Sequence, residues 1–254
     1  MAVQLDSEES RRRWDGFAQT WSDRTGELGD PMREAVLTPA MLRVIGDVAG
    51  KRVLDAGCGE GYLSRLLAKR GASVVAFDYA ASMIRIARER TDSGLDITYS
   101  EGNAERLDWI ADDEFDLIVS NFVLVDLADY VSAIREAFRV LRTDGRFVLS
   151  VPHPCFLTPD CGWERDADGR KLHWNVDRYS EEGPRETKLI RSNDSVLIQF
   201  HRRLSTYTNT LLRTGFTLEQ LVEGKPTEEA IAKNPDWKND LRMTDVLVFD
   251  CRKR

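Results

Sequence analysis

The sequence predicts an α/β fold in which a largely parallel sheet lies between two layers of helices. The first observation behind this prediction is that short apolar runs alternate with amphipathic helical patterns between residues 51 and 151. The second is a glycine-rich turn that joins the first of these runs to the helical pattern after it. Such alternation is typical of βαβ units, whose parallel strands are covered by helices on both faces.

Residues 1–50 are predicted to form a helical cover. Ser7 is a candidate cap for a first helix, which carries three aromatic residues at helical spacing: Trp14, Phe17 and Trp21. These rings either pack on the core or cover a ligand pocket. A second helix is predicted to begin at Thr38, with Pro39 in its first turn, and to end before Gly46.

Residues 51–151 are predicted to hold the strands and helices of a ligand-binding core. The β-prone runs lie at residues 51–55, 73–78, 97–99, 115–120 and 146–151. Apolar residues recur at helical spacing between them, namely Leu63, Leu66 and Leu67, then Met83, Ile86 and Ala87, then Val131, Ile134, Phe138 and Leu141. Residues 143–145 are expected to form the turn before the last strand.

Residues 152–200 break this pattern and are predicted to be an inserted lid. Four of the eight prolines lie there, together with three aromatic residues that could enclose a planar or sugar-like ligand: Trp163, Trp174 and Tyr179. A long segment without regular periodicity is typically functional or ordered by a ligand. Residues 201–254 are predicted to complete a single domain with a helix capped by Ser205 and strands at 216–222 and 243–251.

The composition is that of a soluble globular protein. The chain has 254 residues, a formal charge of −7 at pH 7 and 42% hydrophobic residues. An acidic chain is a poor partner for nucleic acid, which is a polyanion. No run approaches the roughly 18 apolar residues of a membrane span. The polar N-terminus is unlike a secretory signal, so a cytoplasmic location without membrane attachment is expected. The four cysteines are scattered, which disfavours a disulfide framework.

The glycine-rich turn carries the strongest functional signal. Gly57, Gly59 and Gly61 form the pattern G-x-G-x-G, and Asp55 precedes them at the end of the strand. Glycines at this place let a ligand approach the backbone, and the helix N-terminus behind them favours an anionic group. A dinucleotide site needs G-x-G-x-x-G instead, and a carboxylate beside a pyrophosphate is repulsive. The turn therefore fits a zwitterionic ligand without phosphate better than a nicotinamide dinucleotide.

The run from Val53 to Gly61 resembles motif I of the class I S-adenosylmethionine-dependent methyltransferases. Four further parts of the chain resemble that family's motifs in the same order: Asp78, and the segments 101–107, 115–121 and 141–146. The resemblance implies a three-layer sandwich around a seven-stranded, mostly parallel sheet with strand order 3-2-1-4-5-7-6 and an antiparallel strand seven. It also implies methyl transfer from S-adenosylmethionine to an oxygen, nitrogen or carbon atom of a small metabolite.

The same resemblance implies which residues bind the cofactor. From the methionine end to the adenine end they are Asp55, Gly57, Gly59, Gly61, Asp78, Tyr79, Met83, Asn103 and Ala104, with Asn121 and Phe122 along the passage to the methyl group. Asp78 is expected to accept hydrogen bonds from two ribose hydroxyls, a charge-assisted arrangement. Many relatives have aspartate where Asn103 stands, and the amide oxygen of asparagine can still accept from an amino group.

The end of the fourth predicted strand and residues beyond the core bear on the identity of the methyl acceptor. Asn121 and Phe122 follow the fourth strand without the proline pair typical of enzymes that methylate DNA bases or glutamine. Together with the acidic charge, this favours a small-molecule acceptor. His153 and His201 are candidate general bases near neutral pH, or they hold the lid through structural hydrogen bonds. Arg202 and Arg203 either meet an acidic acceptor or are solvated.

Three alternative interpretations of the sequence are a metal site, a cofactor-binding protein without methyl transfer, and an oxidoreductase. The spacing of His153, Cys155, Cys161 and His173 matches no standard zinc site, so no metal is expected. The chain could bind S-adenosylmethionine without transferring its methyl group, because methyl transfer requires no diagnostic base. A nicotinamide-dependent oxidoreductase shares the strand-turn-helix and the acidic residue after the second strand. The sequence does not indicate an oligomeric state.

Overall fold

The computed structural model describes residues 4–190 and 194–254. Its centre is a seven-stranded sheet with the order β10-β11-β5-β4-β1-β2-β3. These strands are β1 Arg52–Ala56, β2 Ser73–Asp78, β3 Ile97–Glu101, β4 Phe115–Asn121, β5 Leu141–Pro152, β10 Phe216–Glu223 and β11 Val246–Lys253. Strand β11 is antiparallel to both of its neighbours, whereas β1 to β5 pair in parallel. The predicted sheet and its strand order are confirmed.

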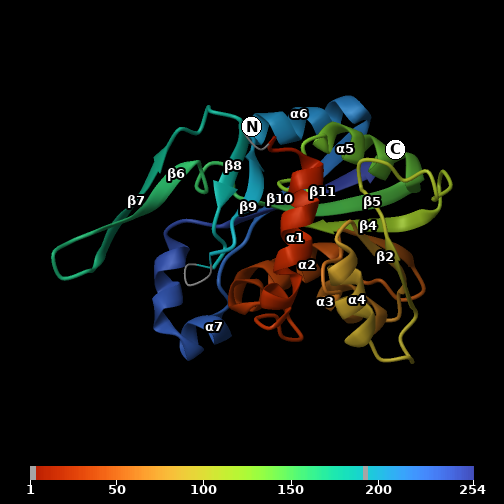
Figure 1. The fold of residues 1–254 in the computed structure, drawn as a ribbon, viewed down its shortest axis with the longest axis horizontal. Coiled ribbons are helices and arrows are strands. Elements are labelled where there is room, and N and C mark those ends of the chain that lie inside the picture. Colours follow the sequence, from red (N-terminus) through yellow and green to blue (C-terminus); the bar gives the residue numbers. More distant parts are fainter. Residues whose placement is uncertain (1–3, 191–193) are drawn as a thin grey trace.

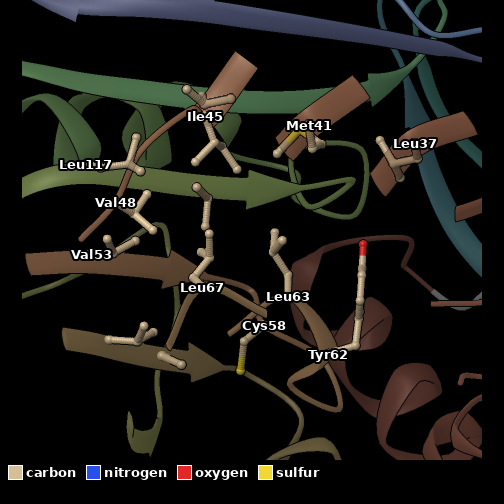
Figure 2. Packing of buried hydrophobic residues seen from close by; sticks show 14 of the residues in the cluster. Leu37, Met41, Ile45, Val48, Val53, Cys58, Tyr62, Leu63, Leu67 and Leu117 are labelled. Carbon is tan, nitrogen blue, oxygen red and sulfur yellow. The ribbon is translucent and has the colours of Figure 1, made fainter. Parts of the chain in front are cut away.

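Helices cover both faces of the sheet (Figure 1). On one face lie α2 (Thr38–Ile45), α3 (Tyr62–Ala68) and α4 (Ala81–Glu89), and on the other lie α5 (Tyr130–Val140) and α6 (Leu204–Thr214). Figure 2 shows Met41 and Ile45 of α2 packed near Leu63 and Leu67 of α3. Fully burying a side chain of this size stabilises a fold by roughly 1.5–3 kcal/mol. One apolar cluster lies on each face of the sheet, between the strands and the helices. Together they hold the strands, and the turns at their ends, in fixed positions.

The first helix, α1 (Ser7–Ser22), lies against α4. The prediction that Ser7 caps it is wrong, because Asp6 Oδ1 accepts from a backbone N–H of the first turn at 2.9 Å. The Ser7 hydroxyl instead donates to Glu105 Oε1 at 2.5 Å and accepts from the backbone N–H of Ala128 at 2.8 Å. It therefore ties α1 to two segments that are distant in the sequence.

The second helix begins earlier than predicted. A π-helical turn, Arg33–Leu37, runs directly into α2, so the chain is already helical before Thr38. Asp30 Oδ1 starts this turn by accepting from two backbone N–H groups at 2.9 and 3.3 Å. The N–H of Thr38 bonds to the carbonyl oxygen of Arg33. This wide turn accommodates Pro39, which has no N–H to donate.

Residues 152–203 contain two β-hairpins. Strand β6 (Asp160–Arg165) pairs with β7 (Lys171–Asp177), and β8 (Gly183–Thr187) pairs with β9 (Leu197–His201). The first hairpin projects from the body of the protein, whereas the second lies beside α1 (Figure 1). Trp163 and Trp174 face each other across the first hairpin, with 5.4 Å between their ring centroids. Their rings therefore stabilise the hairpin itself.

Helix α6 begins at Leu204, so the prediction that Ser205 caps it is wrong. Ser205 lies within the first turn, and the preceding residue, Arg203, makes no side-chain cap. Glu182 takes that role from another part of the chain: its Oε1 accepts from the backbone N–H of Arg203 at 2.8 Å and from the hydroxyl of Thr206. A carboxylate is a favourable group at a helix N-terminus.

The remaining differences lie near the C-terminal strands. Residues 143–145 belong to β5 rather than to a separate turn, and Asp144 there has a φ of +62°. Helix α7 (Glu228–Lys233) and the 3₁₀ helix η2 (Pro235–Leu241) lie between β10 and β11, so the last strand begins later than predicted. Among the described residues, no helix combines the length and the apolar character needed to cross a membrane.

Candidate active site

A cavity of about 690 Å³ lies at the carboxyl ends of β1, β2 and β4. Its walls come from α1, the π-helical turn, the glycine-rich turn, and strands and loops of the 152–200 segment. Nine of the residues predicted to bind the cofactor line it: Asp55, Gly57, Gly59, Asp78, Tyr79, Met83, Ala104, Asn121 and Phe122. The carboxyl edge of a parallel sheet is the usual place for a ligand in such folds.

The glycine-rich turn depends on left-handed backbone conformations. Gly57, Gly59 and Gly61 have φ angles of +78°, +55° and +84°, at which other residues are strained. The backbone N–H groups of Gly57 and the next residue both bond to the carbonyl oxygen of Phe77 at 2.9 Å. The N–H of Gly59 bonds to Asp78 Oδ2 at 2.9 Å. The turn is thus tied to the end of β2, where two of its N–H groups share one acceptor.

Gly57→Ala is expected to lower the free energy of unfolding by about 2–4 kcal/mol, and Gly59→Ala by about 1–2 kcal/mol. Both substitutions place a side chain at positive φ. The Cβ at position 57 would lie 2.3 Å from Val123 Cγ2, however, whereas the Cβ at position 59 would meet no atom within 4 Å. Urea unfolding measures both losses. Adding Val123→Ala should recover part of the first loss, and equal losses without recovery would contradict the predicted clash.

Two buried aspartates face the cavity from β1 and β2. Asp55 Oδ2 accepts from the Ser64 hydroxyl at 2.6 Å, and Asp55 Oδ1 is buried with no hydrogen-bond partner among the described residues. Asp78 accepts from the backbone N–H groups of Gly59 and Ala80, both at 2.9 Å. Burial raises the pKa of Asp55 to about 7 and that of Asp78 to about 6. An ammonium group beside Asp55 Oδ1 would supply the missing partner and favour the charged carboxylate.

A third carboxylate in the cavity, Asp126, escaped the sequence-based prediction. It lies in the loop after β4, where its buried carboxyl group interacts with the indole N–H of Trp14. Burial, and then the negative charge of Asp78, raise the pKa of Asp126 well above its usual range. The sequence did contain a signal for Asp126, because it is the one acidic residue in the apolar run from Val123 to Leu127. Acidic side chains are rarely buried, so an acid in such a run indicates a functional residue.

Asn121 and Phe122 form a rigid wall of the cavity. Asn121 Nδ2 donates to the Tyr62 hydroxyl at 2.5 Å, and the Ser150 hydroxyl donates to Asn121 Oδ1 at 2.8 Å. Phe122 has a φ of +61°, and its backbone N–H bonds to the carbonyl oxygen of Ser150 at 3.2 Å. A left-handed aromatic residue is strained, and such strain persists where surrounding contacts hold it, as at many functional sites.

Gly61 and Asn103 are the predicted cofactor residues that do not line the cavity. Gly61 is the N-cap of α3, where a Cβ would lie 2.5 Å from the Tyr99 hydroxyl. Asn103 is exposed, and its Oδ1 accepts from the backbone N–H of Glu105 at 2.9 Å. Its Nδ2 also donates to Glu105 Oε2 at 3.2 Å. The Asn103 amide is thus engaged within its own turn.

The two candidate bases, His153 and His201, also lie outside the cavity lining. His153 Nε2 lies 3.2 Å from Glu223 Oε1, and its Nδ1 accepts from the backbone N–H of Cys155 at 3.3 Å. His201 Nε2 lies 2.9 Å from the carbonyl oxygen of Tyr179. Burial lowers the pKa of both histidines. These contacts match the structural alternative, in which each ring holds neighbouring backbone in place.

Residues 157–161 and 185–190 complete the cavity from the 152–200 segment. The aromatic residues that were expected to enclose the ligand do not line the cavity: Trp163, Trp174 and Tyr179.

Arg202 neither lines the cavity nor is exposed to solvent. It is buried and donates to the carbonyl oxygens of Leu124, Leu127 and Ala128. Across residues 4–190 and 194–254, no group of three or more His, Cys, Asp or Glu side chains could hold a metal ion.

Comparison with known proteins identifies similar chains over most of this length. A family model described as "Methyltransferase domain" matches residues 54–149. An S-adenosylmethionine dependent methyltransferase from Mesorhizobium loti is 32% identical, with 90% of this chain and 100% of that chain covered and a TM-score of 0.77. A putative S-adenosylmethionine dependent methyltransferase from Listeria monocytogenes is 28% identical, with 84% and 96% covered and a TM-score of 0.71.

A further match is to a ubiquinone biosynthesis O-methyltransferase from Pseudomonas entomophila. It is 31% identical over 142 residues, which are 54% of this chain and 60% of that enzyme. The chain therefore spans less than two thirds of the length of this relative.

Proposed function

The chain belongs to the class I S-adenosylmethionine-dependent methyltransferases, and on this premise we propose that it methylates a small molecule bound in the cavity at the carboxyl edge of the sheet. The methyl donor is S-adenosylmethionine. Membership of this family excludes the alternative activity of a nicotinamide-dependent oxidoreductase. The proposal concerns the acceptor, whose methylated atom is oxygen, nitrogen or carbon, and the residues that hold both reactants.

The observation that carries this proposal is that one cavity joins the cofactor residues to the 152–200 segment. Its volume of about 690 Å³ is in the range of about 300–1,000 Å³ typical of small-molecule sites. Nine of the residues expected at the cofactor line this same space, together with residues at 157–161 and 185–190. The net charge of −7 adds support, because it disfavours nucleic acid as the acceptor.

The buried carboxylates and the wall formed by Asn121 and Phe122 are proposed to position the two reactants. When bound, S-adenosylmethionine supplies an electrophilic methyl group on a sulfonium. Asp55 would pair with the ammonium group through its free Oδ1, and Asp78 would accept from the ribose hydroxyls. Met83 and Ala104 would lie beside the adenine. Asn121, fixed at both ends of its amide, would keep the wall beside the methyl group in place.

We propose that the chain promotes methyl transfer mainly by holding acceptor and donor in line. Such positioning alone can lower the activation free energy substantially. His153 and His201 are engaged by other groups outside the cavity, so neither is proposed as a base. Asp126 lines the cavity beside Trp14, and its buried carboxyl group is proposed to accept a hydrogen bond from a bound reactant.

Incubation with methyl-labelled S-adenosylmethionine and a cell extract tests the proposal. We expect label in the small-metabolite fraction, and none from the Asp78→Ala variant, in which cofactor binding should be lost. Label in protein or nucleic acid would contradict the small-molecule acceptor. Binding of S-adenosylhomocysteine without any labelled product would contradict methyl transfer.

A further inference from the structure

We propose that the methyl acceptor carries an anionic group, a carboxylate or a phosphate, which pairs with the guanidinium of Arg185. This inference rests on the proposed function, because it names the class of small molecule that the cavity takes. Arg185 lies on β8 and lines the cavity. Its position in the 152–200 segment places it with the residues that would surround the acceptor rather than with the motif residues of the core.

The partners of Arg185 are neutral. One terminal nitrogen, Nη1, donates to the carbonyl oxygen of Thr158 at 2.7 Å, and Nη2 donates to that of Leu157 at 3.4 Å. The Nε–H is buried and has no hydrogen-bond partner among the described residues. A guanidinium has five N–H donors, so these bonds leave donors for another group. The guanidinium is thus held in place by backbone carbonyl groups and keeps donors that have no partner among the described residues.

No carboxylate in the described part of the chain forms an ion pair with Arg185. The other cations of the cavity differ in this respect, since Arg33 pairs with Asp30 and Lys188 pairs with Asp194. Arg24 is exposed and therefore hydrated. Burial, the main cause, lowers the pKa of Arg185. Because an unpaired charge away from water is costly, an anion at this place would be stabilised more than a neutral group.

The β-hairpin provides a second donor beside the guanidinium. Arg185 stands directly opposite Gln199 in the antiparallel register of β8 and β9, and both residues line the cavity. Opposite residues of an antiparallel pair lie on the same face of the hairpin. A planar guanidinium binds carboxylate or phosphate oxygens in a bidentate manner, and the neighbouring amide can donate to the same group.

Apart from Arg24, Arg33 and Lys188, the charged residues that line the rest of the cavity are acidic. Asp55, Asp78 and Asp126 line the part formed by the core, where a cationic donor would bind. Asp160 and Asp245 line the cavity too, yet neither forms an ion pair with Arg185, and burial raises the pKa of Asp245 to about 6. An anionic acceptor would therefore be attracted to Arg185 more than to Arg33 or Lys188, which already have carboxylate partners. This attraction would set the orientation of the acceptor toward the donor.

A competing interpretation is that Arg185 only fastens the 157–158 loop to β8. Arg202 shows what a purely structural arginine looks like in this chain. It is buried, donates to three backbone carbonyl oxygens and lies outside the cavity lining. Arg202→Gln is therefore a matched control that removes a buried, carbonyl-bound guanidinium without removing a cation from the cavity.

Calorimetric titration of the protein saturated with S-adenosylhomocysteine tests the proposal, with benzoate, phenyl phosphate and neutral benzamide as probes. We expect benzoate or phenyl phosphate to bind at least about tenfold more tightly than benzamide, which corresponds to about 1.4 kcal/mol. The two anionic probes distinguish a carboxylate from a phosphate. Arg185→Gln should abolish the preference, Arg185→Lys should keep part of it, and Arg202→Gln should keep all of it.

The affinity for S-adenosylhomocysteine separates this inference from the proposed function. It should be unchanged in Arg185→Gln, which would show that the fold and the cofactor site are intact. An equal preference for anions in the wild type and in Arg185→Gln, or no preference in the wild type, would overturn the role of Arg185 while leaving methyl transfer to a small molecule standing. A labelled macromolecule in the transfer assay would overturn the proposed function instead.

Discussion

Asp78→Ala is expected to lower the affinity for S-adenosylhomocysteine by about 100-fold or more. Hydrogen bonds to a charged group contribute about 1.5–3 kcal/mol each, and Asp78 is proposed to accept from two ribose hydroxyls. The substitution also removes the acceptor for the Gly59 N–H, so the glycine-rich turn loses a tie to β2. Isothermal titration calorimetry measures the affinity directly.

Two further variants show whether a loss of affinity is specific to Asp78. Asp78→Asn keeps the size of the side chain and one acceptor oxygen, so its affinity should lie between those of the wild type and Asp78→Ala. Asp250→Asn alters a buried carboxylate that pairs with Arg146 outside the cavity, and it should leave the affinity unchanged. An affinity of Asp78→Ala within about threefold of the wild type would contradict the proposed ribose site.

Asp55→Asn is expected to change how the stability of the cofactor-free protein depends on pH. Burial raises the pKa of Asp55 from 3.8 to about 7 in the folded state. A group whose pKa is raised by folding stabilises the fold below its unfolded pKa, and this contribution is lost as the pH rises toward the folded pKa. The free energy of unfolding of Asp55→Asn, relative to wild type, should therefore increase by about 2 kcal/mol between about pH 5 and pH 7.5.

Urea unfolding of both proteins across this pH range measures the difference, and the subtraction removes the contributions of groups that the two proteins share. Saturating S-adenosylhomocysteine should reduce the pH dependence, because its ammonium group would favour the ionised Asp55 carboxylate. A difference between the two proteins that stays constant with pH would contradict the raised pKa. A pH dependence that the ligand leaves untouched would contradict the proposed ammonium site.

Much of the core could be predicted because its signals are local. The alternation of apolar runs and helical stripes in residues 51–151 reflects the periods of strands and helices. The glycines at 57, 59 and 61 all adopt the positive φ that makes glycine necessary. Asp55 and Asp78 end neighbouring parallel strands, so their positions follow from the strand order.

The helix caps show where local reasoning fails. Ser7 and Ser205 are good cap residues by type, but Ser7 bonds to Glu105 and Ala128, and α6 is capped by Glu182 from another part of the chain. Each of these bonds joins segments far apart in the sequence. A cap prediction that examines only neighbouring residues cannot include such partners.

The 152–200 segment was the least predictable part of the cavity. Trp163 and Trp174 contact each other and Tyr179 contacts His201, whereas the less conspicuous Arg185 reaches the cavity. Whether a side chain faces the cavity depends on where the β8–β9 hairpin lies against the core. That placement is determined by contacts with α1 and the loop after β4, not by the composition of the segment.

The sequence by itself determined the fold, the family and the ligand-binding turn of this protein, because periodicity and glycine conformation are properties of short stretches of chain. Only the tertiary structure decided which polar groups are buried without partners, since burial and pairing depend on segments distant in the sequence. Asp55 Oδ1 and the Nε–H of Arg185 belong to that second class. They are the groups from which the binding of both reactants is inferred.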